Sequence, residues 1–538
     1  MPILQWLNKD QAVTAAKQCA YRLLEEVPEL SYGNSDNENL LIQGDNLEAL
    51  KALIPFYAGK VKFIFIDPPY NTKTAFEHYD DNLEHSVWLS LMYPRIELLH
   101  QLLAPDGFLC CHIDDSEGAY IKIVLDEIFG RSNYQTTFYN QVRYAEKTLK
   151  EDMAYHKQIE YVHIYRKSFL AKPIKPVVDS GFDKFKFEIK LLDAPAKKLE
   201  LGGKIVEVYE KSAYKIIEHS AGSQRGLKEI WATGSILDGN SSGRFFRDYL
   251  SGRVDADGLQ VIYKVYGIGD DIYDHRFFTG PKKTSATKGK YYQGVPLNKL
   301  EQTEKQIPIP NFYDFADRFG NCRHEGGVDF RSGKKPEHYL QLMLSRFSKP
   351  GDLVLDSFLG SGSTAAAAIK MKRRFIGIEI GEQAITHCQP RIKSVVDGDL
   401  TGISDSEGWA GGGGFRFCKL GQTVFDEYGC LSTNIKFPAL AAHIWYLETR
   451  TPLNKKKRSA FLGTHKDTAY YLLYNGILGD RRPDGGNVLT SAILNSLPKI
   501  HEHQGKIVIY GESSRLGEAR LTRSDITFKQ IPYDVGSL

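Results

Sequence analysis

Short apolar runs alternate with longer helical patterns through the first part of the chain. The run at 63–66 is aromatic and β-branched, which is typical of a strand buried on both faces of a parallel sheet. Similar runs lie at 40–42, 108–113, 158–166, 353–355 and 374–380, and helical patterns cover 88–103 and the alanine-rich stretch that ends near 371. Strands that alternate with helices favour a sheet wrapped by helices on both faces. We therefore predict an α/β fold with a doubly wound, mostly parallel sheet.

The pattern changes in three other parts of the chain. Residues 11–26 predict a helix, and 1–38 are expected to form an N-terminal helical arm. Short strands, glycines and mixed charges fill 171–310, which predicts an insert between two halves of the sheet domain at 39–170 and 311–405. The stretch 408–414, which closes on four consecutive glycines, predicts a flexible joint before a small C-terminal α/β domain at 415–538. In that domain we predict a helix over 467–478 and strands at 506–510 and 526–531.

Composition limits the class of protein. The 538 residues allow several domains, and 42% hydrophobic and 25% charged residues describe a globular protein. A net charge of +3 is too even to indicate nucleic-acid binding by itself. The seven cysteines never form a Cys-x-x-Cys pair, so neither a disulfide framework nor a zinc site is expected. No signal peptide or membrane span is expected either, and we predict a cytoplasmic protein without a metal.

The strand at 63–66 runs directly into Asp67-Pro68-Pro69-Tyr70. Prolines cannot continue a sheet ladder, so the chain must turn out of the sheet at its carboxyl edge, where open α/β sheets bind ligands. The carboxylate of Asp67 and the carbonyl of Pro68 can accept the two hydrogens of an exocyclic amino group, and the ring of Tyr70 can stack on a base taken out of a duplex. The alternative is a strand-ending turn without a function.

A second strand delivers a glycine-rich loop. Asp356 ends the strand, Gly360 and Gly362 allow a tight turn toward a ligand, and a helix follows. Glu379 lies 19 residues after Gly360, the spacing at which an acid reaches ribose hydroxyls. A third glycine and a phosphate-loop lysine are both missing, so a nucleoside with an amino-acid tail is the favoured ligand. Asp45, after a shorter strand, either contacts a small ligand or caps the helix that follows.

One segment of the insert is strongly basic. It runs from 276 to 292 without an acid. Glycine, serine and threonine between the cations keep the backbone open to phosphates, which favours nucleic-acid contact over a solvated surface. The candidate contacts are Arg276, Lys282, Lys283, Lys288, Lys290 and Tyr291.

These motifs together resemble one family. Asp67-Pro-Pro-Tyr70 followed far downstream by Asp356-Ser-Phe-Leu-Gly-Ser-Gly-Ser-Thr364 and Glu379 is similar to the amino-methylating DNA methyltransferases that use S-adenosylmethionine. The order of the motifs resembles their circularly permuted β group. The runs Asp67–Thr72, Ile113–Asp115 and Phe528–Tyr533 resemble the modification subunits of type III restriction–modification systems.

The resemblance implies a Rossmann-like methyltransferase that acts on adenine N6 in duplex DNA, with cytosine N4 as the alternative target. Asp67, Pro68, Pro69 and Tyr70 would hold the base, and 171–310 would recognise the target sequence. The residues implied for S-adenosylmethionine are Asp45, Lys335, Asp356, Phe358, Gly360, Ser361, Gly362, Thr364 and Glu379. Ser357 and Ser363 depart from the proline and threonine usual in the family loop.

The resemblance also implies a prokaryotic, DNA-associated protein that forms a homodimer, often with an ATP-dependent restriction subunit. Two other classes stay open. One is a DNA-binding specificity subunit of a defence complex that has lost methylation, and the other is a methyltransferase of RNA or of a protein side-chain amide.

Overall fold

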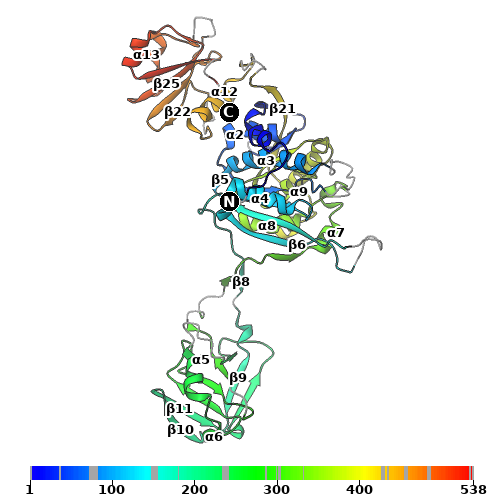
Figure 1. Ribbon diagram of the computed structural model, residues 1–538, viewed down its shortest axis with the longest axis vertical. Coiled ribbons are helices and arrows are strands. Elements are labelled where there is room, and N and C mark those ends of the chain that lie inside the picture. The colour runs from blue at the N-terminus through cyan, green and yellow to red at the C-terminus, as the bar shows by residue number, and fades with distance from the viewer. Residues whose placement is uncertain are drawn as a thin grey trace. The chain divides into compact units, whose positions relative to one another are not determined.

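The computed structural model describes residues 3–34, 38–71, 83–146, 155–179, 181–232, 241–284, 288–297, 300, 304–330, 333–425, 431–432, 435–453, 458–480, 486–531 and 535. Two compact units make up the chain (Figure 1). The first combines Met1–Ile174 with Pro310–Leu538, and the second is Lys175–Ile309. Residue 72, residues 285–287 of the basic segment and residues 532–533 belong to motifs named above and lie outside the described residues.

An 11-stranded sheet organises the first unit. Its strands are β1 Arg22–Glu26, β2 Tyr32–Gly33, β3 Leu40–Gln43, β4 Val61–Ile66, β5 Leu103–Ile113, β6 Tyr134–Gln141, β7 Ile159–Arg166, β18 Phe312–Asp314, β19 Leu353–Asp356, β20 Arg374–Glu379 and β21 Gly414–Thr423. The order is β1-β21-β3-β20-β19-β4-β5-β7-β6-β18, and β2 pairs with β21. Every pair from β21 to β5 is parallel, whereas β1 and β7 run antiparallel to their neighbours.

Helices cover both faces of this sheet. They are α1 Lys9–Gln18, α2 Asn46–Tyr57, α3 His85–Leu102, α4 Gly118–Phe129, α7 Ala316–Asn321, α8 Glu337–Phe347, α9 Ser363–Lys370, α10 Gln389–Val396 and α11 Ser404–Glu407. Ile64 and Ile66 of β4 join a buried core with apolar residues of α1 to α4. The alternate residue Phe63 stacks on Phe347 of α8, with 5.7 Å between ring centroids. Because side chains alternate across a strand, β4 is buried from both sides.

The two motif strands are neighbours. Val354 and Leu355 of β19 pair in parallel with Phe63 and Ile64 of β4. From β4 the chain crosses through α3 to β5 on one side, and from β19 it crosses through α9 to β20 on the other. The strand order therefore reverses between β4 and β19, which is where doubly wound sheets leave a crevice at their carboxyl edge.

The second unit is a separate β domain. Its six-stranded antiparallel sheet has the order β10-β11-β14-β15-β16-β13, and β9 pairs with β12 and β8 with β17. The strands are β8 Val177–Asp179, β9 Phe187–Leu191, β10 Lys197–Leu201, β11 Lys204–Tyr209, β12 Tyr214–Glu218, β13 Lys228–Trp231, β14 Ile262–Tyr266, β15 His275–Thr279, β16 Lys290–Gln293 and β17 Glu304–Gln306. Two short helices, α5 Ser241–Phe245 and α6 Val254–Asp257, complete it.

The C-terminal part adds a four-stranded sheet, with the order β22-β23-β25-β27. Its elements are α12 Phe437–Thr449, β22 Phe461–His465, β23 Thr468–Leu472, β24 Val488–Leu489, α13 Ser491–Ile500, β25 Lys506–Gly511, β26 Ser513–Ser514, α14 Glu518–Arg523 and β27 Ile526–Gln530. β25 and β27 confirm the two strands expected here. None of the helices in the described part of the chain has the length and hydropathy needed to cross a membrane.

Three expectations about elements are wrong. The predicted helix at 11–26 ends at Gln18, and Arg22–Glu26 is a strand that pairs with β21, so the arm is only partly helical. The predicted helix at 467–478 is the strand β23 instead, because its short apolar run pairs with β22 and β25. The boundary at 415 cuts through β21, which lies in the main sheet beside β3.

Candidate active site

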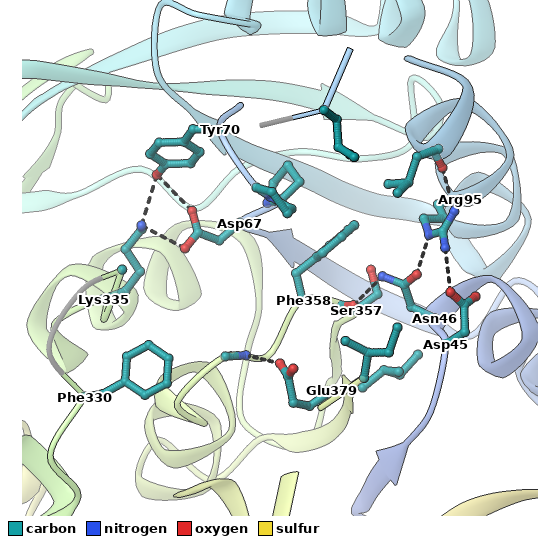
Figure 2. Close-up of a pocket in the computed structure, with 18 residues that line it drawn as sticks. Asp45, Asn46, Asp67, Tyr70, Arg95, Phe330, Lys335, Ser357, Phe358 and Glu379 are labelled. Atoms are coloured by element: carbon teal, nitrogen blue, oxygen red, sulfur yellow. Dashed lines mark hydrogen bonds and ion pairs between the residues drawn. The ribbon is translucent and has the colours of Figure 1, made fainter. Parts of the chain in front are cut away.

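A cavity of about 350 Å³ opens at the carboxyl ends of β4, β19 and β20 (Figure 2). Its volume lies in the range of small-molecule sites. Nine of the residues singled out from the sequence line it, namely Asp45, Asp67, Pro68, Pro69, Tyr70, Lys335, Phe358, Gly360 and Glu379. The remaining lining residues are Asn46, Leu83, Leu91, Arg95, Phe330, Gly333, Ser357, Ile378 and Ile380. The two motifs, which are almost three hundred residues apart in the sequence, therefore share one cavity.

The turn after β4 is held from outside the motif. The indole nitrogen of Trp88, on α3, donates a hydrogen bond to the carbonyl of Pro69 at 2.8 Å. Trp88 itself is fully buried. Neither Pro68 nor Pro69 has an N–H, so neither residue can donate a backbone hydrogen bond within the turn. The turn can thus present the Pro68 oxygen and the Asp67 carboxylate together.

Asp67 is one member of a buried polar cluster. Its Oδ2 lies 2.8 Å from Nζ of Lys335, and its Oδ1 accepts a hydrogen bond from the Tyr70 hydroxyl at 2.9 Å. Lys335 also donates to the Tyr70 oxygen at 3.0 Å (Figure 2). Burial lowers the pKa of Lys335, but the charges of Asp67 and Glu160 outweigh it and raise the pKa above its ordinary value. The ammonium is therefore a fixed counter-charge for the carboxylate.

A second carboxylate lies behind Tyr70. Oε2 of Glu160, on β7, is 3.0 Å from the Tyr70 hydroxyl and 3.0 Å from Nε2 of His112 on β5. Burial opposes ionisation of Glu160, but the close contact with His112 and the charge of Lys335 prevail and lower its pKa to about 2. Burial, Asp67 and Glu160 together raise the pKa of Tyr70 well above its ordinary value. The tyrosine consequently keeps its proton.

The glycine-rich loop is fixed by two acids. Asp356 accepts hydrogen bonds from the Phe358 N–H at 2.9 Å and from the Thr364 hydroxyl at 2.6 Å. Burial raises the pKa of Asp356 to about 7. Glu379 accepts from the Gly360 N–H at 2.7 Å and from the Gly381 N–H at 3.3 Å. Both acids thus shape the loop, and Glu379 also lines the cavity.

The rest of the loop leads into α9. Gly362 caps this helix with φ at 82°, a left-handed conformation that favours glycine. Ser361 and Thr364 line a small pocket of about 20 Å³, which Asp67, Lys335 and Phe358 also line. The guanidinium of Arg391, from α10, donates to the Ser363 hydroxyl at 2.6 Å. The loop is therefore held by α9 and α10 as well as by its own strand.

Asp45 fits both interpretations given above. Its Oδ1 accepts a hydrogen bond from the Leu47 N–H at 2.8 Å, which caps α2, and its Oδ2 pairs with Arg95 at 2.8 Å while the residue lines the cavity. Arg95 also donates to the side-chain oxygen of Asn46, whose amide donates to the Ser357 carbonyl at 2.8 Å. These contacts join the end of β3 to the glycine-rich loop. Neither Asn46 nor Arg95 was singled out from the sequence.

The candidate residues of the basic segment differ in how deeply they are buried. Arg276 and Tyr291 are 4% and 6% exposed, and Arg276 pairs with Asp271 at 2.9 Å inside the insert. Their expected contact with nucleic acid is wrong for this conformation, because both side chains are used by the core. Lys290 is half-buried and pairs with Glu229 at 2.5 Å. The exposed candidates in the described part of this segment are Lys282, Lys283 and Lys288.

Comparison with known proteins assigns the family. The chain matches the family described as DNA methylase over residues 61–389, which is more than half of its length. The chain belongs to this DNA methylase family. The match includes both the Asp67 motif and the glycine-rich loop, and it confirms the resemblance and the fold class that the sequence predicted.

The chain has relatives in several bacteria. The probable type III restriction-modification enzyme HindVI Mod subunit of Haemophilus influenzae is 31% identical over 71% of this chain and 54% of its own length. The type III restriction-modification enzyme EcoP15I Mod subunit of Escherichia coli is 36% identical over 24% of this chain and 25% of its own length. The type II methyltransferase M.KpnI of Klebsiella pneumoniae is 31% identical over 64% of this chain and 79% of its own length. The chain thus spans about half of the length of the Haemophilus relative.

Proposed function

We propose that this chain is a site-specific DNA methyltransferase that transfers a methyl group from S-adenosylmethionine to N6 of an adenine flipped out of duplex DNA. The observation that carries this proposal is the single cavity shared by Asp67-Pro-Pro-Tyr70 and the glycine-rich loop. Membership of the DNA methylase family supports it. The two relatives named as Mod subunits support a role as the modification subunit of a restriction–modification system.

The cavity suits S-adenosylmethionine. When bound, this molecule supplies a methyl group on a positively charged sulfur. Glu379, at the end of β20, presents a carboxylate for ribose hydroxyls, and Phe358 and Ile380 offer apolar surface for a nucleoside base. Asp45 adds a second carboxylate at the rim. Lys335 and the small pocket beside Ser361 are the candidates to hold the amino-acid end.

The Asp67 motif suits a planar amino group. The Asp67 carboxylate and the Pro68 carbonyl accept its two hydrogens, and they offset positive charge that develops on the nitrogen. Lys335 fixes one oxygen of Asp67, so the carboxylate does not have to reorganise during the reaction. Since the donor methyl group is already activated, alignment of the two ligands supplies most of the catalysis.

Adenine is the favoured target because an aspartate, not a serine, precedes the two prolines, a preference implied by the resemblance. The test is transfer of tritium from labelled S-adenosylmethionine to unmethylated genomic DNA, followed by nucleoside analysis. N6-methyladenine is expected, whereas N4-methylcytosine as the only product would overturn the choice of adenine. Transfer to RNA or protein alone, or DNA binding without any transfer, would overturn the proposed function.

We further propose that 171–310 recognises the target sequence and that the active form is a homodimer, which joins an ATP-dependent restriction subunit in the cytoplasm of a prokaryotic cell. Sequencing that detects methylated bases in DNA from cells expressing the chain should reveal one methylated motif. Light scattering of the purified protein tests the dimer, and a monomeric mass would overturn it. Co-purification with the product of an adjacent restriction gene tests the partner.

A further inference from the structure

Three oxygen atoms form a row that begins in the cavity and leads away from it. They are Oδ1 of Asp67, the hydroxyl of Tyr70 and Oε2 of Glu160, separated by 2.9 Å and 3.0 Å. Both distances are those of O–H···O hydrogen bonds. The three side chains come from β7 and from the turn after β4. The row thus links the proposed catalytic carboxylate to a second carboxylate that the proposed function does not use.

The row is short of one proton. Ionised carboxylates only accept hydrogen bonds, and the Tyr70 hydroxyl carries a single hydrogen. Lys335 donates to the Tyr70 oxygen from another direction, at 3.0 Å, and so does not bridge either pair. With both carboxylates ionised, only one of the two contacts is a hydrogen bond at any moment. One additional proton would turn both contacts into hydrogen bonds.

We propose that this row receives the proton that the amino group of the target base loses on methylation, and that Glu160 passes it on to water. This inference rests on the proposed function. Methyl transfer forms a carbon–nitrogen bond and breaks the carbon–sulfur bond, whose electron pair stays on sulfur. In the same step the nitrogen loses one proton to Asp67, and the N–H electron pair stays on nitrogen. Asp67 passes a proton to the Tyr70 oxygen as the Tyr70 hydrogen moves to Glu160.

The surroundings of Glu160 fit this role. His112 lies 3.0 Å from its Oε2, and the His112 Nδ1 lies 3.3 Å from the hydroxyl of Tyr339 on α8. His112 is fully buried, whereas the Glu160 side chain is 17% exposed, so a proton held on Glu160 can reach water. Glu160 is ionised before the reaction, and its low pKa means that it gives up the proton readily and is ionised again afterwards. Because it acts through Tyr70, Glu160 is a positioning residue and not a catalytic one.

Glu160→Gln tests the proposal, since glutamine keeps the shape and one acceptor but cannot accept the proton and pass it on. We expect single-turnover methyl transfer to unmethylated genomic DNA to slow by about 10²-fold or more, the contribution typical of a positioned proton acceptor. The affinities for S-adenosylmethionine and for DNA should change by less than about twofold. The melting temperature should change by no more than a few degrees. Glu127→Gln is the matched control, because Glu127 is also largely buried in an ion pair, with Lys9, but lies on α4.

A double-mutant cycle separates a relay from a structural effect. Tyr70→Phe keeps the ring but removes the shared hydroxyl. If protons pass through Tyr70, adding Glu160→Gln to Tyr70→Phe costs no further rate, whereas independent structural effects multiply. The solvent deuterium isotope effect on transfer should also change in Glu160→Gln. In the protein alone, the ¹³Cζ resonance of Tyr70 should shift in Glu160→Gln, since the hydroxyl loses a carboxylate partner.

A wild-type rate in Glu160→Gln, or rates that multiply in the double variant, would overturn the relay and leave the proposed function intact. Failure of the wild-type chain to methylate DNA would overturn the proposed function and the relay with it. The two failures are therefore distinguishable in one set of assays.

Discussion

Asp67 has partners on both carboxylate oxygens before any ligand arrives. Asp67→Ala removes the acceptor for the target amino group and leaves Lys335 without this counter-charge. We expect methyl transfer to fall by at least about 10²-fold, the cost typical of removing one preorganised electrostatic group, while DNA affinity changes only a few-fold. Tritium transfer and a DNA gel-shift assay measure the two quantities.

The matched control for this prediction is Asp106→Ala. The side chain of Asp106 is 54% exposed and pairs with Lys62, and the residue lies near the start of β5. Wild-type methylation by Asp67→Ala would contradict the assigned role, and an equal loss in both variants would point to a general effect on folding.

The pKa of Asp356 gives a prediction about stability. The folded protein raises this pKa from 3.8 to about 7, so it binds the proton more tightly than the unfolded chain does. Ionisation of this carboxyl therefore lowers the free energy of unfolding as pH rises from about 4 to about 7, by about 1.4 kcal/mol for each unit by which the two pKa values differ. In Asp356→Asn, the amide can keep both hydrogen bonds, accepting from Phe358 and donating to Thr364.

We expect the stability of Asp356→Asn, relative to the wild type, to increase with pH across this window and to level off above about 7. Urea unfolding at several pH values measures the difference. If the stabilities of the two proteins instead change in parallel with pH over the whole range, the carboxyl is already ionised in the folded protein below pH 4.

Site residues were predictable from sequence where they are consecutive or lie at a fixed spacing. Asp67 to Tyr70 are consecutive, and Glu379 has a fixed spacing from Gly360, so both stand out as patterns. Glu160 does not, because a single acid in an alternating strand is the same pattern as a solvent-facing position. Arg276 was misjudged for a related reason, since basic composition does not reveal that Asp271 pairs with the guanidinium inside the core.

Strands, like site residues, were predictable where a local sequence pattern identifies them. The strands β4 and β19 were predictable because they are apolar on both faces, as a buried parallel strand must be. β23 was not, because its apolar run of five residues is compatible with either a helix or a strand until its neighbours are known. β1 depends on β21, which lies almost four hundred residues later in the chain. Pairing over such a separation leaves no local pattern.

Lys51 connects two elements that the sequence did not link. It lies on α2, is 2% exposed, and its ammonium donates to the carbonyls of Ala16, Lys17 and Cys19 at the end of α1. Lys51→Met leaves these last carbonyls of α1 without their donor, which should cost about 1–3 kcal/mol. We expect a lower melting temperature and faster amide hydrogen exchange in Lys9–Gln18.

The control is Lys60→Met, the same substitution at an exposed position just after α2. Unchanged exchange in α1 after Lys51→Met would show that packing alone holds this helix. Slower exchange would contradict the prediction directly.

The insert has the features of an independent domain. Its antiparallel sheet contains two apolar cores that are built only from residues of 187–292, including Phe278, Tyr263 and Tyr292. The main sheet, in contrast, is assembled from segments on both sides of the insert, since β4 pairs with β19. A long insertion is compatible with this arrangement because closing a longer loop adds little entropy cost. The insert can therefore carry a function of its own.

The exposed lysines of the insert allow this function to be tested in the full chain. If Lys282, Lys283 and Lys288 contact DNA phosphates, replacing all three by alanine should weaken DNA binding and lower the salt dependence of log Kd by about 0.9 per lost contact. The matched control replaces three other exposed lysines of the insert by alanine and so makes the same change in net charge. These are Lys184, Lys190 and Lys215. Equal weakening by both triples would indicate general charge attraction, whereas a selective loss with unchanged S-adenosylmethionine affinity would locate the duplex at the basic segment.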